Sequence, residues 1–481
     1  MSEYPRLQRS GLAPKIGIVH LGPGAFFRAF NAVYTHEAMA KAGGDWGILA
    51  VSLRSTTARD QLVPQGGVYS AVTLATGEET TQVIEAIADV IVAPEDPGAV
   101  VTAMADPSVK IVSLTITEKG YCHEPATGAL IMDHPDIAHD LAHLDRPRSA
   151  IGFIVAALAQ RRAAGHWAFT VLSCDNLPSN GTVARSAVLG FARAVDPDLA
   201  EWIAKEASFP ATMVDRITPA TTQADIDRLA QTEGYHDPAC VMHEAFRQWV
   251  IEDDFVDGRP AWEIGGAQFA ASVEAHEAMK LRCLNGTHST LAYLGYLAGY
   301  ETIADCVADP DFAALCTHLW REEITPVVTQ PDGEDLEAYC AALLKRYRDP
   351  SIRHRTWQIA MDGSQKLPQR ILGTISDNLA AGNKPAGLCL AVAAWMRYVG
   401  GIDESGAAID VKDPMAARLK EISDAAEDKV AALLGVEEVF GTDLPNNTAF
   451  RSAVLSAYDN LVQQGAQKSV MAFARPQPSI S

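Results

Sequence analysis

The chain begins with a short apolar segment, a glycine turn and a helix-compatible segment, in that order. Residues 15–21 are predicted to form a strand, Gly22-Pro-Gly24 a turn, and residues 25–34 a helix. In such a unit the first glycine permits the tight turn, the second lets a pyrophosphate approach the backbone, and the helix N-terminus attracts its charge. This order predicts a dinucleotide-binding unit. Phe27 stands where the usual fingerprint has a third glycine, so an ordinary turn remains an alternative.

Three more strands are predicted in the first half, over residues 46–53, 109–117 and 169–175, with alanine-rich helical segments such as 151–164 between them. This alternation predicts an α/β fold with a Rossmann-like, doubly wound sheet. The last two strands end in polar residues, Thr117-Glu118-Lys119-Gly120 and Asp175-Asn176. Ligands of open parallel sheets bind beyond the carboxyl ends of the strands, so both ends are candidate sites.

The second half is predicted to be mostly helical. A chain of 481 residues exceeds the usual size of a single core, and the strand pattern fades after about residue 279. We therefore expect a dinucleotide-binding domain over residues 1–278 and a mostly α-helical substrate domain over residues 279–481, with the active site in the cleft between them. The periodic apolar segments are 291–297, 312–320, 336–344, 388–399, 415–434 and 450–461.

The end of the second predicted strand bears on the choice of coenzyme. NAD favours an acidic residue there, whereas NADP favours basic and small polar residues. The chain has Arg54-Ser-Thr-Thr-Ala-Arg59 before Asp60, so the first acid comes late. The sequence leaves NAD and NADP both open, and Arg54 and Arg59 can equally be solvated turn residues.

The segment Lys280-Leu-Arg-Cys-Leu-Asn285-Gly-Thr-His288 is a candidate for proton transfer. At about 100° per residue on a helix, Asn285 lies roughly 140° and His288 roughly 80° from Lys280, so all three can face one cleft. A lysine acts as a base only when neutral, so its pKa must be lowered by burial or nearby positive charge. The alternative is a solvated lysine beside a capping asparagine and a packed histidine.

A second candidate is the stretch from Ser351 to Arg370. Four arginines and lysines plus His354 fall within eighteen positions of an otherwise acidic chain. Such a patch suits a carboxylate or several sugar hydroxyls. A surface helix with scattered charges explains the same pattern equally well.

Charge and composition restrict the partners. The net charge is −21, which argues against nucleic acid or an anionic membrane as the main partner. The eight cysteines include no CxxC pair, the N-terminus lacks the apolar core of a signal peptide, and the longest apolar stretch, 388–396, is too short to span a bilayer. A reduced, soluble cytoplasmic protein is the simplest expectation.

Six motifs in order along the chain resemble the polyol-specific long-chain dehydrogenase/reductases. They are His20-Leu-Gly-Pro-Gly-Ala-Phe-Phe-Arg-Ala29, Ser113-Leu-Thr-Ile-Thr-Glu-Lys-Gly-Tyr121, Leu172-Ser-Cys-Asp-Asn-Leu-Pro178, Met213-Val-Asp-Arg-Ile-Thr-Pro219, Phe246-Arg-Gln-Trp-Val-Ile-Glu-Asp253, and Lys280 through Tyr296. The resemblance implies a metal-independent oxidoreductase that acts on secondary alcohols and ketones with a nicotinamide coenzyme, NAD, with NADP open.

The resemblance also implies roles for individual residues. Lys280 resembles the general base, Asn176 and Asn285 the amide donors to the developing alkoxide, and His288 the imidazole that positions the substrate. The implied substrate-binding residues are Asp215, Lys366, Gln358 and Arg370, and the implied proton path is Glu118 and Glu277. The residues implied in coenzyme binding are Gly22, Gly24, Ala25, Phe26, Arg28, Arg54 and Thr117.

Departures from the mannitol dehydrogenase pattern favour a sugar acid. Gln358 stands where mannitol dehydrogenases have an arginine, and segments 354–370 and 395–404 resemble fructuronate reductases more closely. We expect mannonate and fructuronate as the substrate pair, with mannitol 2-dehydrogenase or a related polyol dehydrogenase as the alternative. Thr56 and Thr57 replace an acidic pair of NAD-specific mannitol dehydrogenases. We expect no nucleic acid or membrane partner, and a monomer or small homo-oligomer.

Two rival hypotheses remain. His139 and His143, four residues apart beside Asp140, have a spacing that could bind zinc, although a third ligand is not apparent. The chain could also be a nucleotide sensor without catalysis, but Lys280 and its polar partners are all present.

Overall fold

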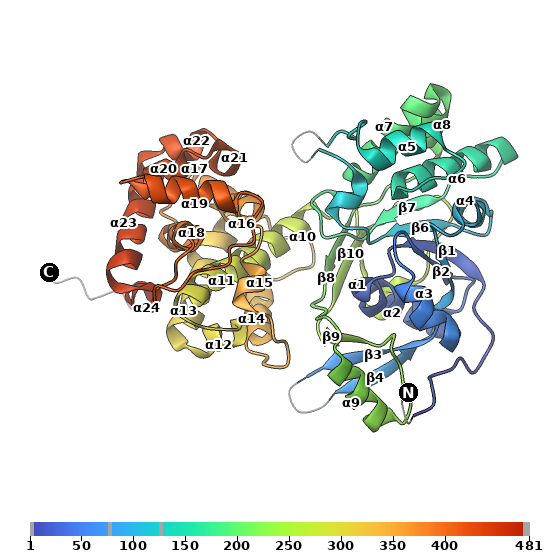
Figure 1. The fold of residues 1–481 in the computed structure, drawn as a ribbon, viewed down its shortest axis with the longest axis horizontal. Coiled ribbons are helices and arrows are strands. Elements are labelled where there is room, and N and C mark those ends of the chain that lie inside the picture. The colour runs from blue at the N-terminus through green and yellow to red at the C-terminus, as the bar shows by residue number, and fades with distance from the viewer. Residues whose placement is uncertain (1–3, 76–78, 125–127, 475–481) are drawn as a thin grey trace. The chain divides into compact units, whose positions relative to one another are not determined.

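The computed structural model describes residues 4–75, 79–124 and 128–474. Contacts between Cα atoms divide the chain into two compact units, Met1–Glu274 and Ala275–Ser481 (Figure 1). The eight cysteines are buried free thiols. Among the described residues, no helix combines the length and apolar character that crossing a membrane requires.

Unit 1 is built on a five-stranded sheet of β1 (Ile16–Leu21), β2 (Gly47–Ser52), β5 (Ile87–Val92), β6 (Ile111–Leu114) and β7 (Thr170–Ser173). The order is β5-β2-β1-β6-β7, and every pair of neighbours is parallel. Parallel strands need crossover connections, which place helices on the two faces of the sheet. The expected α/β fold with a doubly wound, Rossmann-like sheet is confirmed.

Alternate residues of each strand supply two separate cores. Val19 and Val112 pack on one face, with helices α4 (Pro97–Ala105), α6 (Ala150–Ala164), α7 (Asn180–Val195) and α8 (Pro197–Glu206). Ile18 and Ile111 pack on the other face, with α1 (Ala25–Ala29) and α2 (Asn31–Ala42). The strands are therefore buried on both faces and continuously apolar, which is why four of them could be located from the sequence.

Two smaller sheets complete unit 1. One has the order β11-β10-β8, from β8 (Thr212–Asp215), β10 (Gln248–Glu252) and β11 (Gln268–Ala270). The other has the order β4-β3-β9, from β3 (Tyr69–Leu74), β4 (Thr80–Ile84) and β9 (Val241–Glu244). The sequence analysis did not predict these strands or β5. Most are short, and β4 is partly exposed, so their apolar pattern is weak.

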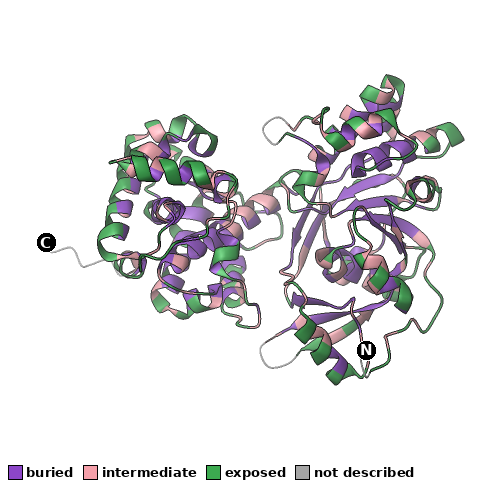
Figure 2. Ribbon diagram, in the orientation of Figure 1, coloured by how far each residue is buried: buried purple, intermediate pink, exposed green. Residues whose placement is uncertain are grey.

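Within the described residues, the secondary-structure elements of unit 2 are helices joined by loops. All of α18 (Ala386–Val399) except Ala386 and Arg397 is buried, as Figure 2 shows. A helix that is apolar on all sides belongs inside a core, and α11 (Thr287–Leu297) and α23 (Thr448–Gln464) pack against it. The remaining α-helices are α10 (Glu274–Met279), α12 (Ile303–Ala308), α13 (Pro310–His318), α14 (Leu336–Tyr347), α15 (Thr356–Ile359), α16 (Gly363–Leu367), α17 (Gly373–Ala380), α19 (Ala416–Ala425), α20 (Lys429–Leu434), α21 (Glu437–Phe440), α22 (Asp443–Asn446) and α24 (Ala466–Ala474).

One predicted helix is divided in the structure. The periodic segment 415–434 forms two helices, α19 and α20, rather than one. The carboxylate of Asp428 accepts a hydrogen bond from the backbone N–H of Ala431 at 2.9 Å. This N-cap starts a new helix, because the side chain satisfies a donor that has no partner inside the first turn.

Candidate active site

The glycine turn after β1 has the geometry that a dinucleotide requires. Gly22 has φ +95°, and a Cβ there would lie 2.3 Å from the carbonyl oxygen of Thr115, so only glycine fits. A Cβ at Gly24 would meet only the carbonyl oxygen of Gly22, at 4.0 Å. The backbone of Gly24 is therefore open to an approaching pyrophosphate, and α1 begins at the next residue.

His20 ties β1 to β6 below this turn. Its Nδ1 lies 2.8 Å from Ser113 Oγ and its Nε2 lies 2.9 Å from Thr115 Oγ1. Burial lowers the pKa of His20 to about 3, so the ring is neutral near pH 7. Phe27, at the position of the absent third glycine, stacks on this ring with centroids 3.5 Å apart. The third glycine serves close helix–strand packing, and here a ring stack holds the short helix α1 against the strand instead.

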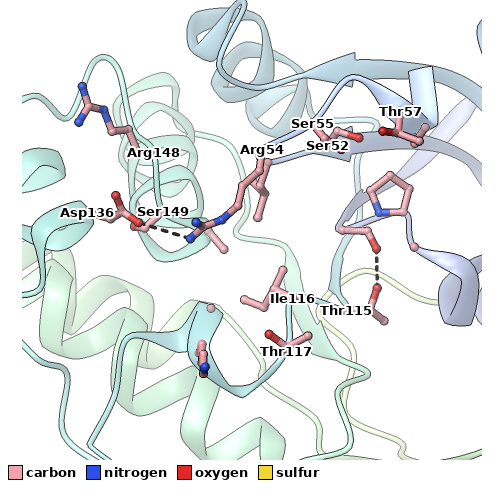
Figure 3. A pocket seen from close by; sticks show the side chains of 18 of the residues that line it. Ser52, Arg54, Ser55, Thr57, Thr115, Ile116, Thr117, Asp136, Arg148 and Ser149 are labelled. Carbon is pink, nitrogen blue, oxygen red and sulfur yellow. Dashed lines mark hydrogen bonds and ion pairs between the residues drawn. The ribbon is translucent and has the colours of Figure 1, made fainter. Parts of the chain in front are cut away.

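A cavity of about 740 Å³ opens beside the turn (Figure 3). Five of the residues implied in coenzyme binding line it: Gly22, Gly24, Arg28, Arg54 and Thr117. The other two, Ala25 and Phe26, pack partly buried against the core below. The cavity follows the carboxyl ends of β1, β2 and β6, where an open parallel sheet binds its ligand.

Asp175 fixes the loop that follows β6. Its buried carboxylate accepts hydrogen bonds from the N–H groups of Thr117 (2.7 Å) and Ile116 (3.1 Å) and from the hydroxyl of Tyr121 (2.7 Å). Thr117 has φ +65°, so these bonds hold a backbone conformation that threonine rarely adopts. Burial raises the pKa of Asp175, while these hydrogen bonds favour its charged form. From the sequence, Asp175 was a candidate only as a polar residue at the end of a predicted strand, with no role of its own. The available signal was a carboxylate at the end of a buried strand.

Three further predicted residues lie in unit 1. Asn176 is exposed directly after Asp175, and Glu118 is exposed at the start of a 3₁₀ turn, Glu118–Tyr121. Asp215 is buried at the end of β8. The next residue, Arg216, donates to the carbonyl oxygen of Ala29 at 2.6 Å, which joins the end of β8 to the end of α1.

The zinc hypothesis is not supported. Asp140 accepts hydrogen bonds from the backbone N–H groups of Arg148 and Ser149, both at 2.8 Å, and lies 2.9 Å from His139 Nδ1. Its carboxylate is therefore occupied in holding a loop. Within the described part of the chain, no group of three or more His, Cys, Asp or Glu side chains is placed to hold a metal ion.

In unit 2, Lys280 and Asn285 lie on a π-helix, Lys280–Gly286, inserted between α10 and α11. The expectation of a regular α-helix was wrong. A π-helix bonds i to i+5 and turns less per residue, so the angles expected among the three side chains do not apply. Lys280 and His288 are nonetheless buried, with 7% and 6% exposure, and Asn285 is half-buried. The alternative of a solvated lysine is excluded.

Side chains from neighbouring helices satisfy the carbonyl groups of this π-helix. Trp320 Nε1 donates to the carbonyl oxygen of Cys283 at 2.9 Å, and the hydroxyl of Tyr347 donates to that of Leu284 at 2.8 Å. The hydroxyl of Thr287 also donates to the carbonyl oxygen of Cys283, at 2.6 Å. π-bulges of this kind occur frequently at functional sites. No feature of the sequence distinguished these three residues.

A second π-helix, Pro368–Leu372, packs against the first. A Cβ at Gly286 would lie 2.8 Å from the carbonyl oxygen of Arg370, so glycine permits the close approach. The guanidinium of Arg370 donates to Ser289 Oγ at 3.1 Å. The two segments that the sequence analysis selected separately are thus joined inside unit 2.

This junction carries a basic cluster of His288, His354, Lys366 and Arg370. The His288 ring lies 4.6 Å from that of His354, edge to face, and stacks on Tyr347 at 5.2 Å. The ammonium group of Lys366 donates to the carbonyl oxygen of Met361 at 2.6 Å.

Burial lowers the pKa of every member of the cluster, and repulsion from neighbouring charges lowers those of His288, His354 and Lys366 further. The pKa of His288 lies well below its ordinary value, first through burial and then through the charges of His354 and Arg370. Burial followed by the charge of Lys366 lowers the pKa of His354 to about 4. Burial followed by the charge of Arg370 lowers that of Lys366 to about 8. Near pH 7 the two imidazole rings are therefore neutral, and Lys366 and Arg370 are the charged pair that is suited to binding an anion.

The remaining two predicted residues of unit 2 lie outside this cluster. Gln358 is exposed on α15, and Glu277 is half-buried on α10.

Two family models together match most of the chain. The Mannitol dehydrogenase Rossmann domain matches residues 16–264, and the Mannitol dehydrogenase C-terminal domain matches residues 272–462.

Similar proteins agree with these matches. The chain is 49% identical to D-mannonate oxidoreductase of Escherichia coli, covering 95% of each chain. It is 40% identical to mannitol 2-dehydrogenase of Phaeosphaeria nodorum, covering 98% of this chain and 83% of that protein. A solved ternary complex of Pseudomonas fluorescens mannitol 2-dehydrogenase with NAD and D-mannitol superimposes with a TM-score of 0.86 at 39% identity, covering 98% and 97% of the two chains. The chain is therefore an oxidoreductase that belongs to the mannitol dehydrogenase family.

Proposed function

We propose that this enzyme interconverts D-mannonate and D-fructuronate with NAD(H). The observation that carries the choice of a sugar acid is the basic cluster of His288, His354, Lys366 and Arg370. A substrate carboxylate would offset the repulsion between the charged Lys366 and Arg370, whereas an uncharged polyol would not. The 49% identity with a D-mannonate oxidoreductase supports the same choice.

The coenzyme would lie against Gly22, Gly24 and Arg28 in the cavity of unit 1. The positive φ of Gly22 and the open backbone at Gly24 fit a pyrophosphate. NAD is the coenzyme held in the solved Pseudomonas fluorescens relative. Bound there, the coenzyme would supply reversible hydride transfer between the secondary alcohol and the ketone.

The residues of the chain would handle the proton and the oxygen. Neutral Lys280 takes the hydroxyl proton, and its burial favours the neutral amine. The amides of Asn176 and Asn285 donate to the developing alkoxide. His288 positions the sugar and Asp215 contacts it.

Glu118 and Glu277 would pass the proton from Lys280 to solvent. Lys366 and Arg370 would bind the carboxylate, and Gln358 would contact the sugar from α15. Gln358 and Glu118 are exposed in the structure, so both must approach the substrate from the solvent side.

A polyol is the second candidate substrate. Mannitol 2-dehydrogenases are 39–40% identical over nearly the whole chain, and the solved relative holds D-mannitol. The reaction would then interconvert D-mannitol and D-fructose, or D-arabinitol and D-xylulose, with the same residues in the same roles.

Oxidation of NADH, followed with D-fructuronate, D-tagaturonate, D-fructose and D-xylulose, tests the proposal. D-Fructuronate should give the highest kcat/KM, and higher values with D-fructose or D-xylulose would favour the polyol alternative. Activity should survive treatment with a chelator, because no step requires a metal. Turnover of none of these ketones, with NADH still bound, would support a nucleotide sensor instead.

Replacement of Lys280 by alanine tests the proton transfer. Lys280→Ala should lower kcat by about 10²–10⁴-fold, the usual contribution of a general base, while NADH affinity stays within about twofold. Lys345→Ala, an exposed lysine on α14, is the matched control and should retain full activity. Equal loss of NADH binding in Lys280→Ala would show that Lys280 is structural.

We further propose a cytoplasmic enzyme that acts as a monomer or small homo-oligomer, with no nucleic acid or membrane partner. The net charge of −21 supports this, because it repels polyanions and anionic lipid surfaces.

A further inference from the structure

A second cavity of about 700 Å³ adjoins the coenzyme cavity of unit 1. The two share Leu53, Arg54, Asp136 and Arg148 in their walls. The shared wall begins directly after β2 (Gly47–Ser52), where this fold places the adenosine ribose of a dinucleotide. The second cavity therefore lies on the ribose side of the coenzyme site.

Basic side chains dominate this region. Arg54, Arg146, Arg148, His139 and His143 line the second cavity, and Asp136 is the one acidic residue among its lining residues. Such a local excess of basic groups in a chain with a net charge of −21 marks a place where an anion can be held.

Arg54 forms only a loose, exposed ion pair with Asp136. Its side chain is 86% exposed, and its guanidinium lies 3.7 Å from the carboxylate of Asp136, beyond hydrogen-bond distance. Figure 3 shows it reaching from the end of β2 across the cavity toward Asp136. An exposed pair at this separation contributes little, so the guanidinium keeps donors for an incoming group.

In NAD enzymes of this fold, an acidic residue after β2 usually hydrogen-bonds the ribose 2′-hydroxyl. In this chain the corresponding acid bonds to other side chains. The first acid after β2 is Asp60, which accepts hydrogen bonds from Thr56 Oγ1 (2.6 Å) and from Arg59 (2.9 and 3.0 Å). Arg59 also pairs with Glu95. Neither Asp60 nor Arg59 is among the residues that line the two cavities.

The loop that carries Arg148 is held in place by hydrogen bonds from its backbone N–H groups to Asp140. The buried carboxylate of Asp140 accepts from the N–H groups of Arg148 and Ser149 at 2.8 Å, and from Ser149 Oγ at 2.7 Å. Figure 3 shows the Arg148 side chain at the outer edge of the cavity, turned away from Arg54. This side chain is exposed and lines both cavities, so it can change rotamer while its backbone stays in place.

We propose that Arg54, with Arg148 and the hydroxyl groups of Ser55 and Thr57, binds the 2′-phosphate of an NADP-type coenzyme. The planar guanidinium presents paired donors that match a phosphate, and small hydroxyl side chains are the usual companions. The enzyme accordingly uses NADP(H) as well as NAD(H). The inference rests on the proposed coenzyme site at Gly22 and Gly24, and not on the identity of the sugar.

Fluorescence titration of the protein with NADPH and with NADH tests the proposal. The two dissociation constants should agree within about tenfold. Adenosine 2′,5′-bisphosphate should displace NADPH at least about tenfold more effectively than ADP, because it differs by the position of one phosphate. As the salt concentration rises, NADPH binding should weaken more than NADH binding, and the advantage of adenosine 2′,5′-bisphosphate over ADP should shrink.

Single substitutions assign the effect to Arg54. Arg54→Ala should weaken NADPH binding by about tenfold or more and leave NADH binding within about twofold. Arg54→Asp should weaken NADPH binding further. Arg59→Ala, five residues later and outside both cavities, is the matched control and should leave the ratio of the two constants unchanged. Retained NADH binding shows that each variant is folded.

Two results would overturn the proposal. One is NADPH binding that is at least a hundredfold weaker than NADH binding in the unaltered protein. The other is equal loss of both coenzymes in Arg54→Ala. Failure of the proposed sugar-acid function would look different, because coenzyme binding would persist while D-fructuronate gave no turnover.

Discussion

The hydroxyl of Tyr347 lies 2.8 Å from the carbonyl oxygen of Leu284, in the π-helix that carries Lys280 and Asn285. The same hydroxyl lies 2.8 Å from Thr287 Oγ1, and the Tyr347 ring stacks on His288. One side chain from α14 therefore contacts both the irregular turn and the imidazole. We infer that Tyr347 positions the segment on which the proposed chemistry depends.

The variant Tyr347→Phe tests this relationship. It keeps the ring and removes the hydroxyl, so the carbonyl oxygen of Leu284 loses its bond from α14 and keeps only those from Thr287. We expect kcat to fall by about tenfold, equivalent to about 1.4 kcal/mol in the barrier, and the pH profile of kcat to shift. NADH binding should not change. Steady-state kinetics from pH 6 to 10 provide both measurements.

Tyr300→Phe is the matched control for this prediction. Its hydroxyl donates to the carboxylate of Asp309 at 2.8 Å, also in unit 2 but outside the π-helix. Tyr300→Phe should lower the thermal midpoint about as much as Tyr347→Phe does. It should leave kcat and the pH profile of kcat unchanged. The same change of profile in both variants would mean that Tyr347 supports the fold and nothing more specific.

Gly286→Ala should separate the two π-helices. The added methyl group would meet the carbonyl oxygen of Arg370 at 2.8 Å, so the backbone must shift. We expect a loss of about 1–3 kcal/mol in stability, the usual cost of overpacking, and a raised KM for D-mannonate because Arg370 moves. Gly373→Ala, whose nearest contact would be at 3.8 Å, should leave both quantities nearly unchanged. Unchanged KM in Gly286→Ala would contradict the coupling.

The two glycines of the unit 1 turn should respond differently to alanine. Gly22→Ala meets both a positive φ and the carbonyl oxygen of Thr115, so it should lower the thermal midpoint as well as NADH affinity. Gly24→Ala meets no such contact and should leave stability intact while weakening NADH binding by about tenfold, because its methyl group faces the pyrophosphate. Calorimetry and fluorescence titration distinguish the two effects. Equal NADH affinity in Gly24→Ala and the unaltered protein would remove the pyrophosphate from this position.

Recognition of D-mannonate should weaken in alkali. Because burial and the charge of Arg370 lower the pKa of Lys366 to about 8, its positive charge is present below that pH and lost above it. The KM for D-mannonate should therefore rise above pH 8, by up to about tenfold per pH unit, while that for D-mannitol rises less. Lys366→Arg keeps its charge at all these pH values and should remove the difference. Parallel pH profiles for the two substrates would contradict carboxylate binding by Lys366.

Acid should destabilise the protein through its buried histidines. The pKa of His354 falls from 6.5 in the unfolded chain to about 4 in the fold, so between these values the unfolded chain binds the extra proton. Stability conferred by neutral His354 is thus complete above pH 6.5 and is lost as the pH falls toward 4. Proton binding at one such histidine lowers the free energy of unfolding by about 1.4 kcal/mol between pH 7.5 and pH 5.5.

His354→Asn tests this contribution. The free energy of unfolding, measured on the full-length protein by chemical denaturation at the two pH values, should depend less on pH in the variant than in the unaltered protein. His166→Asn, an exposed histidine in unit 1, should show no reduction. An unchanged difference in His354→Asn would mean that His354 already carries a proton in the folded protein.

The sequence alone was sufficient for the elements whose signal is local. Buried parallel strands are continuous apolar runs, so β1, β2, β6 and β7 could be located within a few residues. The glycine turn at 22–24 was predicted because its conformation admits only certain residue types. The helical nature of the second half followed from apolar periodicity. The strands β3, β4, β5, β8, β9, β10 and β11 were not located from the sequence.

Tertiary structure decided the geometry of the candidate site. Nothing in the residues from Lys280 to Gly286 distinguishes a π-helix from an α-helix, because the irregular turn is stabilised by Trp320 and Tyr347, far along the chain. The role of Asp175 likewise depends on the loop after β6, which lies beside it only in the folded sheet. The lowered pKa of Lys366 depends on burial and on the nearby Arg370 charge. Residue types and their order set which groups are available, whereas desolvation and contacts between distant segments determine their orientation and charge.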